Sequence, residues 1–296
     1  ILAFMNSFLG IPIALAGAVT TAVLIFDIIS DPIIGYFSDK TVSRFGRRAP
    51  WMLVGAVVLA LAMIGLFAVP ENFTTNVSLI WVTVFFLIST VGFTMVSIPY
   101  GAMAGEMTLD KKERSSMTAW RMAFASLGIL VGGALIPILA GDTKSGYTFA
   151  AICVAPLIIL SIWISVFFTR NAPRTLVPSQ QNFSYIIKLV LANRAFVTLV
   201  ILYGIMTLAI ALITAGLPFA AMYLILDDGE SLLSGVSKGL GTLSLIFAAF
   251  VIGSIISQAI WVKLSNLYGK VMAQLIGIVC YISLLIFIFL SLPNYN

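Results

Sequence analysis

The segment from residue 12 to residue 38 reads PIALAGAVTTAVLIFDIISDPIIGYFS. It is long enough to cross the hydrocarbon core of a bilayer, which takes about 20 apolar residues in a helix. Two acids, Asp27 and Asp31, interrupt it. An acid near the middle of a spanning helix costs about 2.5 to 3.5 kcal/mol on insertion scales, so such residues mark functional sites. The segment therefore predicts a membrane helix that carries a polar function.

The composition extends this prediction to the whole chain. Hydrophobic residues make up 61% of the 296 and charged residues 9%, with a mean hydropathy of +1.12. Soluble domains are usually about 45–50% apolar and 25% charged. The apolar runs do not alternate as β-barrel strands would. We expect an all-α membrane protein, with a partial helix over 1–9 and eight spans near 12–38, 50–70, 77–104, 117–140, 147–169, 195–226, 239–264 and 271–292.

The lysines and arginines predict the orientation. Thirteen of the 16 lie in loops that alternating spans place on one side, two lie on the other side, and Arg121 falls within a span. Loops rich in Lys and Arg stay cytoplasmic. We expect loops 39–49, 105–116, 170–194 and 263–270 to be cytoplasmic, in a membrane of the bacterial plasma-membrane type.

The longest polar stretch, 170–194, predicts the domain organisation. It divides an N-terminal bundle over 1–169, from the end of helix one to helix six, from a partial C-terminal bundle of helices seven to nine over 195–296. We expect both ends of the chain to be truncated. We also expect a monomer.

Several kinds of site are disfavoured. The chain has no histidine, which removes the commonest general base and metal ligand. The two cysteines, Cys153 and Cys280, lie inside apolar runs without metal-ligand spacing. The basic residues sit in short loops, so the net charge of +5 does not indicate nucleic-acid binding. We expect no cofactor and no enzymatic activity.

The two acids of the second helix are the sharpest candidate site. Asp27 and Asp31 are four residues apart, so they share one helix face with Cβ atoms about 5–6 Å apart. Two like charges in a poorly solvated site favour a bound cation or a shared proton. Pro32 removes the hydrogen bond to the Ile28 carbonyl and frees another oxygen. The alternative is that Asp31 ends the span and both acids meet water or the basic loop.

Polar side chains on other helices extend the prediction. Thr20 and Ser38 lie on the same side of the second helix as the acids, and a second polar face runs along the fourth. That face consists of Thr90, Thr94, Ser97 and Gly101. Its hydroxyl groups suit a cation or a polyol, although hydrogen bonds between helices are the alternative.

Further candidates lie on later helices. Small residues follow Arg121 at helical spacing, which favours an Arg121 side chain directed into the bundle; a snorkelling arginine is the alternative. Tyr203, Thr207 and Gln258 are candidate substrate contacts, and ordinary helix packing is the alternative for each.

The loop after the second helix is a candidate gate. Gly46 allows a tight turn, and Asp39 can bond a nearby base among Arg44, Arg47 and Arg48 or a helix end. A loop that only fixes the topology is the alternative.

Several of these motifs together resemble a known family, the glycoside–pentoside–hexuronide cation symporters. This is the melibiose-permease branch of the major facilitator superfamily. The residues that carry the resemblance are Asp27-x-x-x-Asp31-Pro-x-x-Gly35, Arg44-Phe-Gly46-Arg47-Arg48-x-Pro50-Trp51, and Ser97-Ile98-Pro99-Tyr100 followed by Leu109-Asp110-Lys111-x-Glu113-Arg114.

The resemblance implies twelve helices in two bundles and transport by alternating access. It implies that Asp27, Asp31 and Thr94 form a Na⁺ or H⁺ site, and that Arg121 lies near the substrate. Ser97 and Gly101 depart from melibiose permease, which has an acid and a tryptophan there. We therefore expect a kept cation site and an open choice of sugar or glycoside. The alternatives are a proton-coupled exporter, a lipid-type transporter and, more remotely, an intramembrane enzyme.

Overall fold

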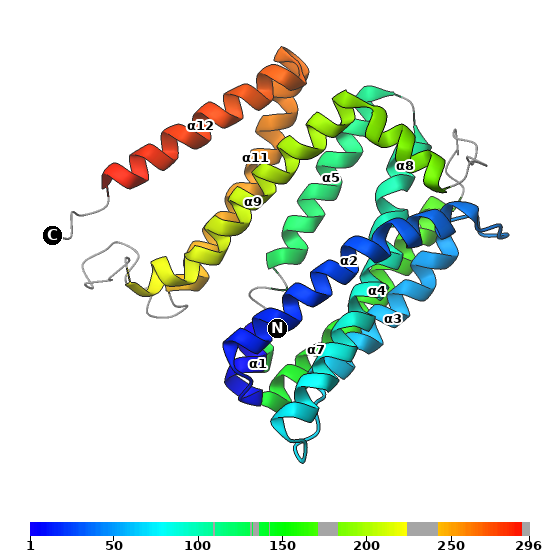
Figure 1. Ribbon diagram of the computed structural model, residues 1–296. Helices are drawn as coiled ribbons and strands as arrows, with labels where there is room; N and C mark the ends of the chain where they lie inside the picture. Colours follow the sequence, from blue (N-terminus) through cyan, green and yellow to red (C-terminus); the bar gives the residue numbers. More distant parts are fainter. Residues whose placement is uncertain are drawn as a thin grey trace. The chain divides into compact units, whose positions relative to one another are not determined.

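The computed structural model describes residues 1–108, 110–130, 132, 136–141, 143–170, 183–223 and 242–291 (Figure 1). The regular elements within these ranges are helices, as the sequence predicts. They are α1 (Leu2–Leu9), α2 (Ile13–Lys40), α3 (Ala49–Phe67), α4 (Thr75–Met107), α5 (Lys111–Leu130), α6 (Ile136–Ala140), α7 (Lys144–Thr169), α8 (Phe183–Ala192), α9 (Arg194–Tyr223), α11 (Thr242–Tyr268) and α12 (Lys270–Ser291).

The described helices confirm a membrane protein. Among the described residues, five helices are long and apolar enough to cross a bilayer: α2, α3, α4, α7 and the part of α12 from Lys270 to Phe287. Large apolar side chains cover their outer faces; Ile28 is 72% exposed and Phe168 78%. Because exposed apolar surface on this scale is unstable in water, these faces belong in lipid. Cys153 and Cys280 are exposed free thiols on the same kind of surface.

Two regions differ in detail from the prediction. The span expected over 117–140 is divided into α5 and α6, with residues 131 and 133–135 outside the described ranges. The pair Gly132-Gly133 lies at this division, and glycine destabilises a helix interior by about 0.5 to 1 kcal/mol relative to alanine. In addition, the stretch expected as a linker contains α8, whose sequence FSYIIKLVLA is largely apolar.

The chain divides into two units. Unit 1 comprises Ile1–Leu109 and Gly132–Asp228, and unit 2 comprises Asp110–Val131 and Gly229–Asn296. The predicted boundary between two bundles at 170–194 stays a prediction. In unit 2, α5 packs on α11, and α11 contacts α12 across Gly269, which has a positive φ of 81°.

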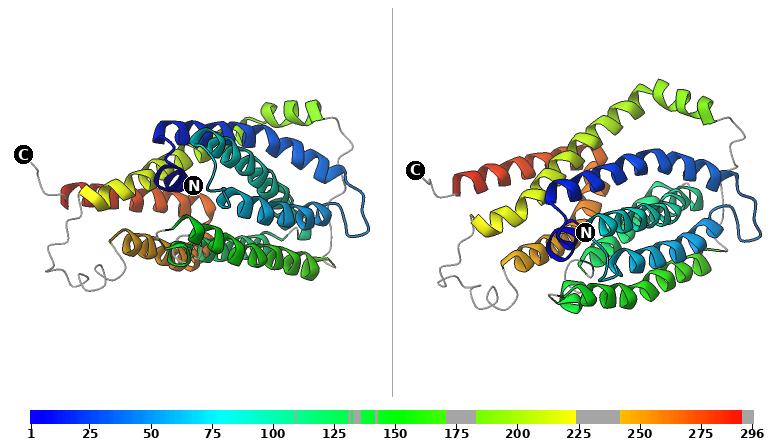
Figure 2. Two further views of the ribbon diagram at one scale, coloured as in Figure 1. Left: turned by 90° about the horizontal axis from the view of Figure 1, so that it is seen from below. Right: turned by 60° about the horizontal axis from the view of Figure 1, so that its bottom comes forward.

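Helices α2, α3, α4 and α7 of unit 1 lie side by side, with α4 in contact with both α2 and α3 (Figure 2). The α3–α4 contact depends on glycine. A Cβ atom at Gly92 would lie 2.6 Å from the Leu59 backbone nitrogen, and one at Gly55 would lie 2.7 Å from Met95 Cβ. These backbones can approach so closely only because side chains are missing at the crossing.

The two ends of unit 1 differ in character. One end holds an apolar cluster in which Phe4 of α1 meets Phe67 of α3 edge-on, with a centroid distance of 5.0 Å, and also contacts Tyr147 of α7. The other end, where α2, α4 and α7 finish and α3 begins, holds arginines and acids. Segments predicted to lie on one side of the membrane therefore do meet at one end of this unit.

Candidate functional site

The acid pair of α2 meets a threonine of α4. The Thr94 hydroxyl lies 3.0 Å from Asp27 Oδ1 and 3.0 Å from Asp31 Oδ1. Thr94 is completely buried, and both acids are half-buried. The two carboxylate oxygens thus converge on one hydroxyl group in the interior of a helix pair.

Local sequence explains how these three residues meet. The four-residue spacing of Asp27 and Asp31 places both on the face of α2 that contacts α4. Gly35 lets α4 approach one turn further on, where a Cβ would lie 3.4 Å from Ile98 Cγ2. Pro32 sits inside α2, where it cannot donate a backbone hydrogen bond.

The arrangement suits a single positive charge. A hydroxyl has one hydrogen to donate, so Thr94 can satisfy one carboxylate oxygen fully or two in part. Because each Oδ1 lies 3.0 Å from the same atom, both can approach one small ion or share one proton. Carboxylate and hydroxyl oxygens are hard ligands suited to hard cations. Across the described residues, no group of three metal-binding side chains forms, so no larger acidic site competes there.

The other polar residues of α2 behave differently. The Thr20 hydroxyl donates to the Ala16 carbonyl at 2.9 Å, and the Ser38 hydroxyl donates to the Gly35 carbonyl at 2.9 Å. Each therefore bonds within its own helix, as hydroxyl residues in helices commonly do. In these hydrogen bonds the polar stripe of α2 reaches α4 through its acids.

The predicted substrate residues are only partly placed. Ser97 and Gly101 are half-buried on α4, one and two turns beyond Thr94. Arg121 is half-buried on α5 in unit 2. Tyr203 is 74% exposed, and Thr207 donates to its carbonyl at 2.8 Å. The side chain of Gln258 lies outside those described. Their roles stay predictions.

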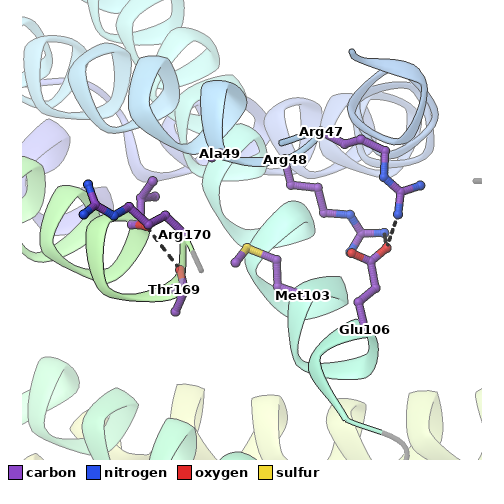
Figure 3. A pocket seen from close by; sticks show the side chains of 8 residues that line it. Arg47, Arg48, Ala49, Met103, Glu106, Thr169 and Arg170 are labelled. Atoms are coloured by element: carbon purple, nitrogen blue, oxygen red, sulfur yellow. Dashed lines mark hydrogen bonds and ion pairs between the residues drawn. The ribbon is translucent and has the colours of Figure 1, made fainter. Parts of the chain in front are cut away.

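The predicted gating loop forms a charge cluster with α4. Arg48 Nη2 donates to Asp39 Oδ1 at 2.7 Å and to Glu106 Oε1 at 3.1 Å, and Arg47 Nη2 donates to Glu106 Oε1 at 3.0 Å (Figure 3). Gly46 has a positive φ of 95° that turns the chain before the arginines. Arg44 lies outside these ion pairs, with its guanidinium over the Phe45 ring.

Sequence reasoning missed Glu106. This residue is 8% exposed, close to the end of α4, and it carries the carboxylate that both arginines share. An isolated acid at the end of an apolar span was the available signal. Its partners lie 58 and 59 positions earlier in the chain, which no local pattern indicates.

A family model described as MFS/sugar transport protein matches residues 1–295. The chain belongs to this family. Its membership agrees with the described fold of apolar helices and identifies the chain as part of an integral membrane transporter. The resemblance found in the sequence motifs is thereby confirmed at the level of the family.

Individual relatives of this MFS chain are named as symporters. It is 29% identical to the putative glycoside/cation symporter YagG of Escherichia coli K12 over 64% of the chain and 42% of YagG. It is 27% identical to the uncharacterized symporter YjmB of Bacillus subtilis 168 over 94% of the chain and 59% of YjmB. It is 23% identical to the sodium-dependent lysophosphatidylcholine symporter 1 of Mus musculus over 91% of the chain and 55% of that protein. The chain therefore spans about half the length of these relatives.

Proposed function

We propose that this MFS chain forms part of a secondary transporter that couples Na⁺ or H⁺ to the movement of a sugar or glycoside-like solute by alternating access. The observation that carries the proposal is the convergence of Asp27 and Asp31 on the buried Thr94 hydroxyl. A membrane helix keeps two acids at this depth only when they have a function. The glycoside/cation symporter among the relatives supports the same assignment.

The coupling follows from charge. Two carboxylates on one turn of helix repel each other, and a cation or proton between them removes the repulsion. The loaded site then favours the conformation that binds substrate. This coupling is a free energy shared by the two ligands, so the substrate raises the affinity for the cation by the same factor.

The energy available is sufficient for accumulation. Each monovalent cation that enters gains about 2.3 kcal/mol per 100 mV of membrane potential. A tenfold concentration gradient adds about 1.4 kcal/mol. We expect the basic loops, including 39–49, to face the cytoplasm, so that inward cation flow drives uptake.

The test uses the full-length protein in proteoliposomes. Asp27→Asn removes one carboxylate charge and keeps the side-chain shape, so accumulation driven by a Na⁺ or H⁺ gradient should fall by at least about tenfold, the factor that 1.4 kcal/mol supplies. Asp110→Asn, at an exposed loop position, is the matched control. Gradient-driven accumulation at the unaltered rate and stoichiometry in Asp27→Asn would overturn the assignment.

A second substrate class is supported by one observation. The relative that matches across 91% of the chain is named as a lysophosphatidylcholine symporter. Uptake of a labelled lysophospholipid, measured beside a panel of glycosides at varied Na⁺ and pH, separates the two classes. The cation site is the same in both cases.

A further inference from the structure

The charge cluster at the loop end of unit 1 borders a pocket. Arg47, Arg48 and Arg170 line this pocket together with Glu106 and the first residue of α3, Ala49 (Figure 3). Its volume is about 310 Å³, including the part open to solvent. Three guanidinium groups and one carboxylate give the lining an excess of positive charge.

Arg48 is incompletely satisfied in this pocket. It is 9% exposed, and its Nη2 atom makes the two ion pairs with Asp39 and Glu106. Within the described part of the chain, its Nε and Nη1 atoms are buried and have no hydrogen-bond acceptor. Burying a charged donor without an acceptor is costly. The pocket therefore needs further acceptor oxygens beside Arg48.

The start of α3 adds to the positive potential. Arg48 is the N-cap residue of this 19-residue helix, and its side chain forms no cap hydrogen bond. The first amide groups of a helix and its dipole favour an anion. Even when the Asp39 carboxylate is counted with Glu106, the three arginines leave one positive charge unbalanced.

The position of the pocket points to the chemistry of the anion. It lies where α2, α4 and α7 end and α3 begins, and all four helices are long enough to span a bilayer. Lipid headgroups occupy this depth, beyond the hydrocarbon core. Basic pockets between the ends of membrane helices bind anionic headgroups, and guanidinium donors match the oxygens of phosphate.

We propose that this pocket is a binding site for a phosphate-bearing anion, held by Arg48 and the start of α3, with Arg170 at the rim. The Arg170 guanidinium lies over the Phe167 ring, with 4.3 Å between Cζ and the ring centroid, on an exposed side chain. The site is separate from Asp27, Asp31 and Thr94, and it holds whether or not the transport proposal does. The phosphate belongs either to an anionic lipid or to free phosphate.

The experiment measures binding to the full-length protein in a phosphate-free, non-ionic detergent. Phosphatidylglycerol, phosphatidylcholine and inorganic phosphate are added separately. Native mass spectrometry counts retained lipids, and thermal unfolding reports stabilisation by each probe. Arg48→Gln and Arg170→Gln are compared with Arg194→Gln, which removes an exposed arginine outside the pocket.

A lipid source predicts retention of phosphatidylglycerol over phosphatidylcholine. A free-phosphate source predicts stabilisation by inorganic phosphate alone. In either case, the affinity should fall about tenfold or more in Arg48→Gln and by a smaller factor in Arg170→Gln, and it should not change in Arg194→Gln. If Arg48→Gln fails to fold, the comparison of Arg170→Gln with Arg194→Gln decides. Equal binding by those two variants, or no stabilisation of the wild type by any probe, would overturn the proposal and leave water as the occupant.

Discussion

The acid pair and the loop cluster of unit 1 are opposite solutions to the same electrostatic problem. In each, two like charges converge on one shared group. Arg47 and Arg48 share the carboxylate of Glu106, a full opposite charge. Asp27 and Asp31 share the hydroxyl of Thr94, which is neutral. The first arrangement contains its own counter-charge, whereas the second leaves room for a mobile one.

The largest effect should come from removing the shared carboxylate. Glu106→Gln leaves Arg47 and Arg48 without their common counter-charge in a site where all three side chains are at most 17% exposed. Breaking a buried ion pair from one side costs about 3 to 5 kcal/mol. We expect a clear fall in the thermal unfolding midpoint in detergent. Glu71→Gln, in an exposed turn, should unfold like the wild type; an equal fall in both variants would contradict the role given to Glu106.

The shared hydroxyl should matter less for stability than for cation binding. Thr94→Ala removes a hydrogen bond to carboxylate, worth about 1.5 to 3 kcal/mol when one partner is charged. We expect the cation concentration for half-maximal stimulation of uptake to rise by about tenfold or more.

Thr83→Ala is the matched control for this change, because the Thr83 hydroxyl donates to the Leu79 carbonyl of its own helix at 2.7 Å. If both variants shift the cation dependence equally, the Thr94 hydroxyl has no special part in the site.

The smallest effect should follow from Arg44→Gln. Arg44 belongs to the same loop as Arg47 and Arg48 but is exposed and outside their ion pairs with Glu106 and Asp39. Surface substitutions of this kind change stability by about 0.5 kcal/mol or less. Thermal unfolding of this variant beside Glu106→Gln separates the loss of charge from the loss of a buried partner. A large destabilisation by Arg44→Gln would show that the loop's total charge is what stabilises it.

The two regions were not equally predictable from sequence. The spacing of Asp27 and Asp31 on one helix already places them on a common face, because helix geometry is local. The partnership with Thr94 needed a second helix, and the polar face of α4 together with the family resemblance indicated it. The bond between Arg48 and Asp39 spans nine positions, and the loop composition predicted a contact of this kind.

Glu106 escaped prediction because its partners are set by tertiary packing between α3 and α4. The helix α8 escaped for a different reason: the prolines and polar residues before it dominate the composition of 170–194. The division of the predicted span 117–140 had a visible signal, since two consecutive glycines stand there. That pair was interpreted only as a surface for close helix packing.

The glycine crossing of α3 and α4 has a consequence for how selectivity for the ion can be altered. Gly92 stands two positions before Thr94, and even a methyl group there would collide with the Leu59 backbone. The two helices are thereby interlocked, and the coordinates of the Thr94 oxygen are inherited from main-chain contact instead of from neighbouring side chains. A residue with no functional group of its own thus becomes a determinant of ligand geometry, which a mutational scan confined to polar positions would overlook.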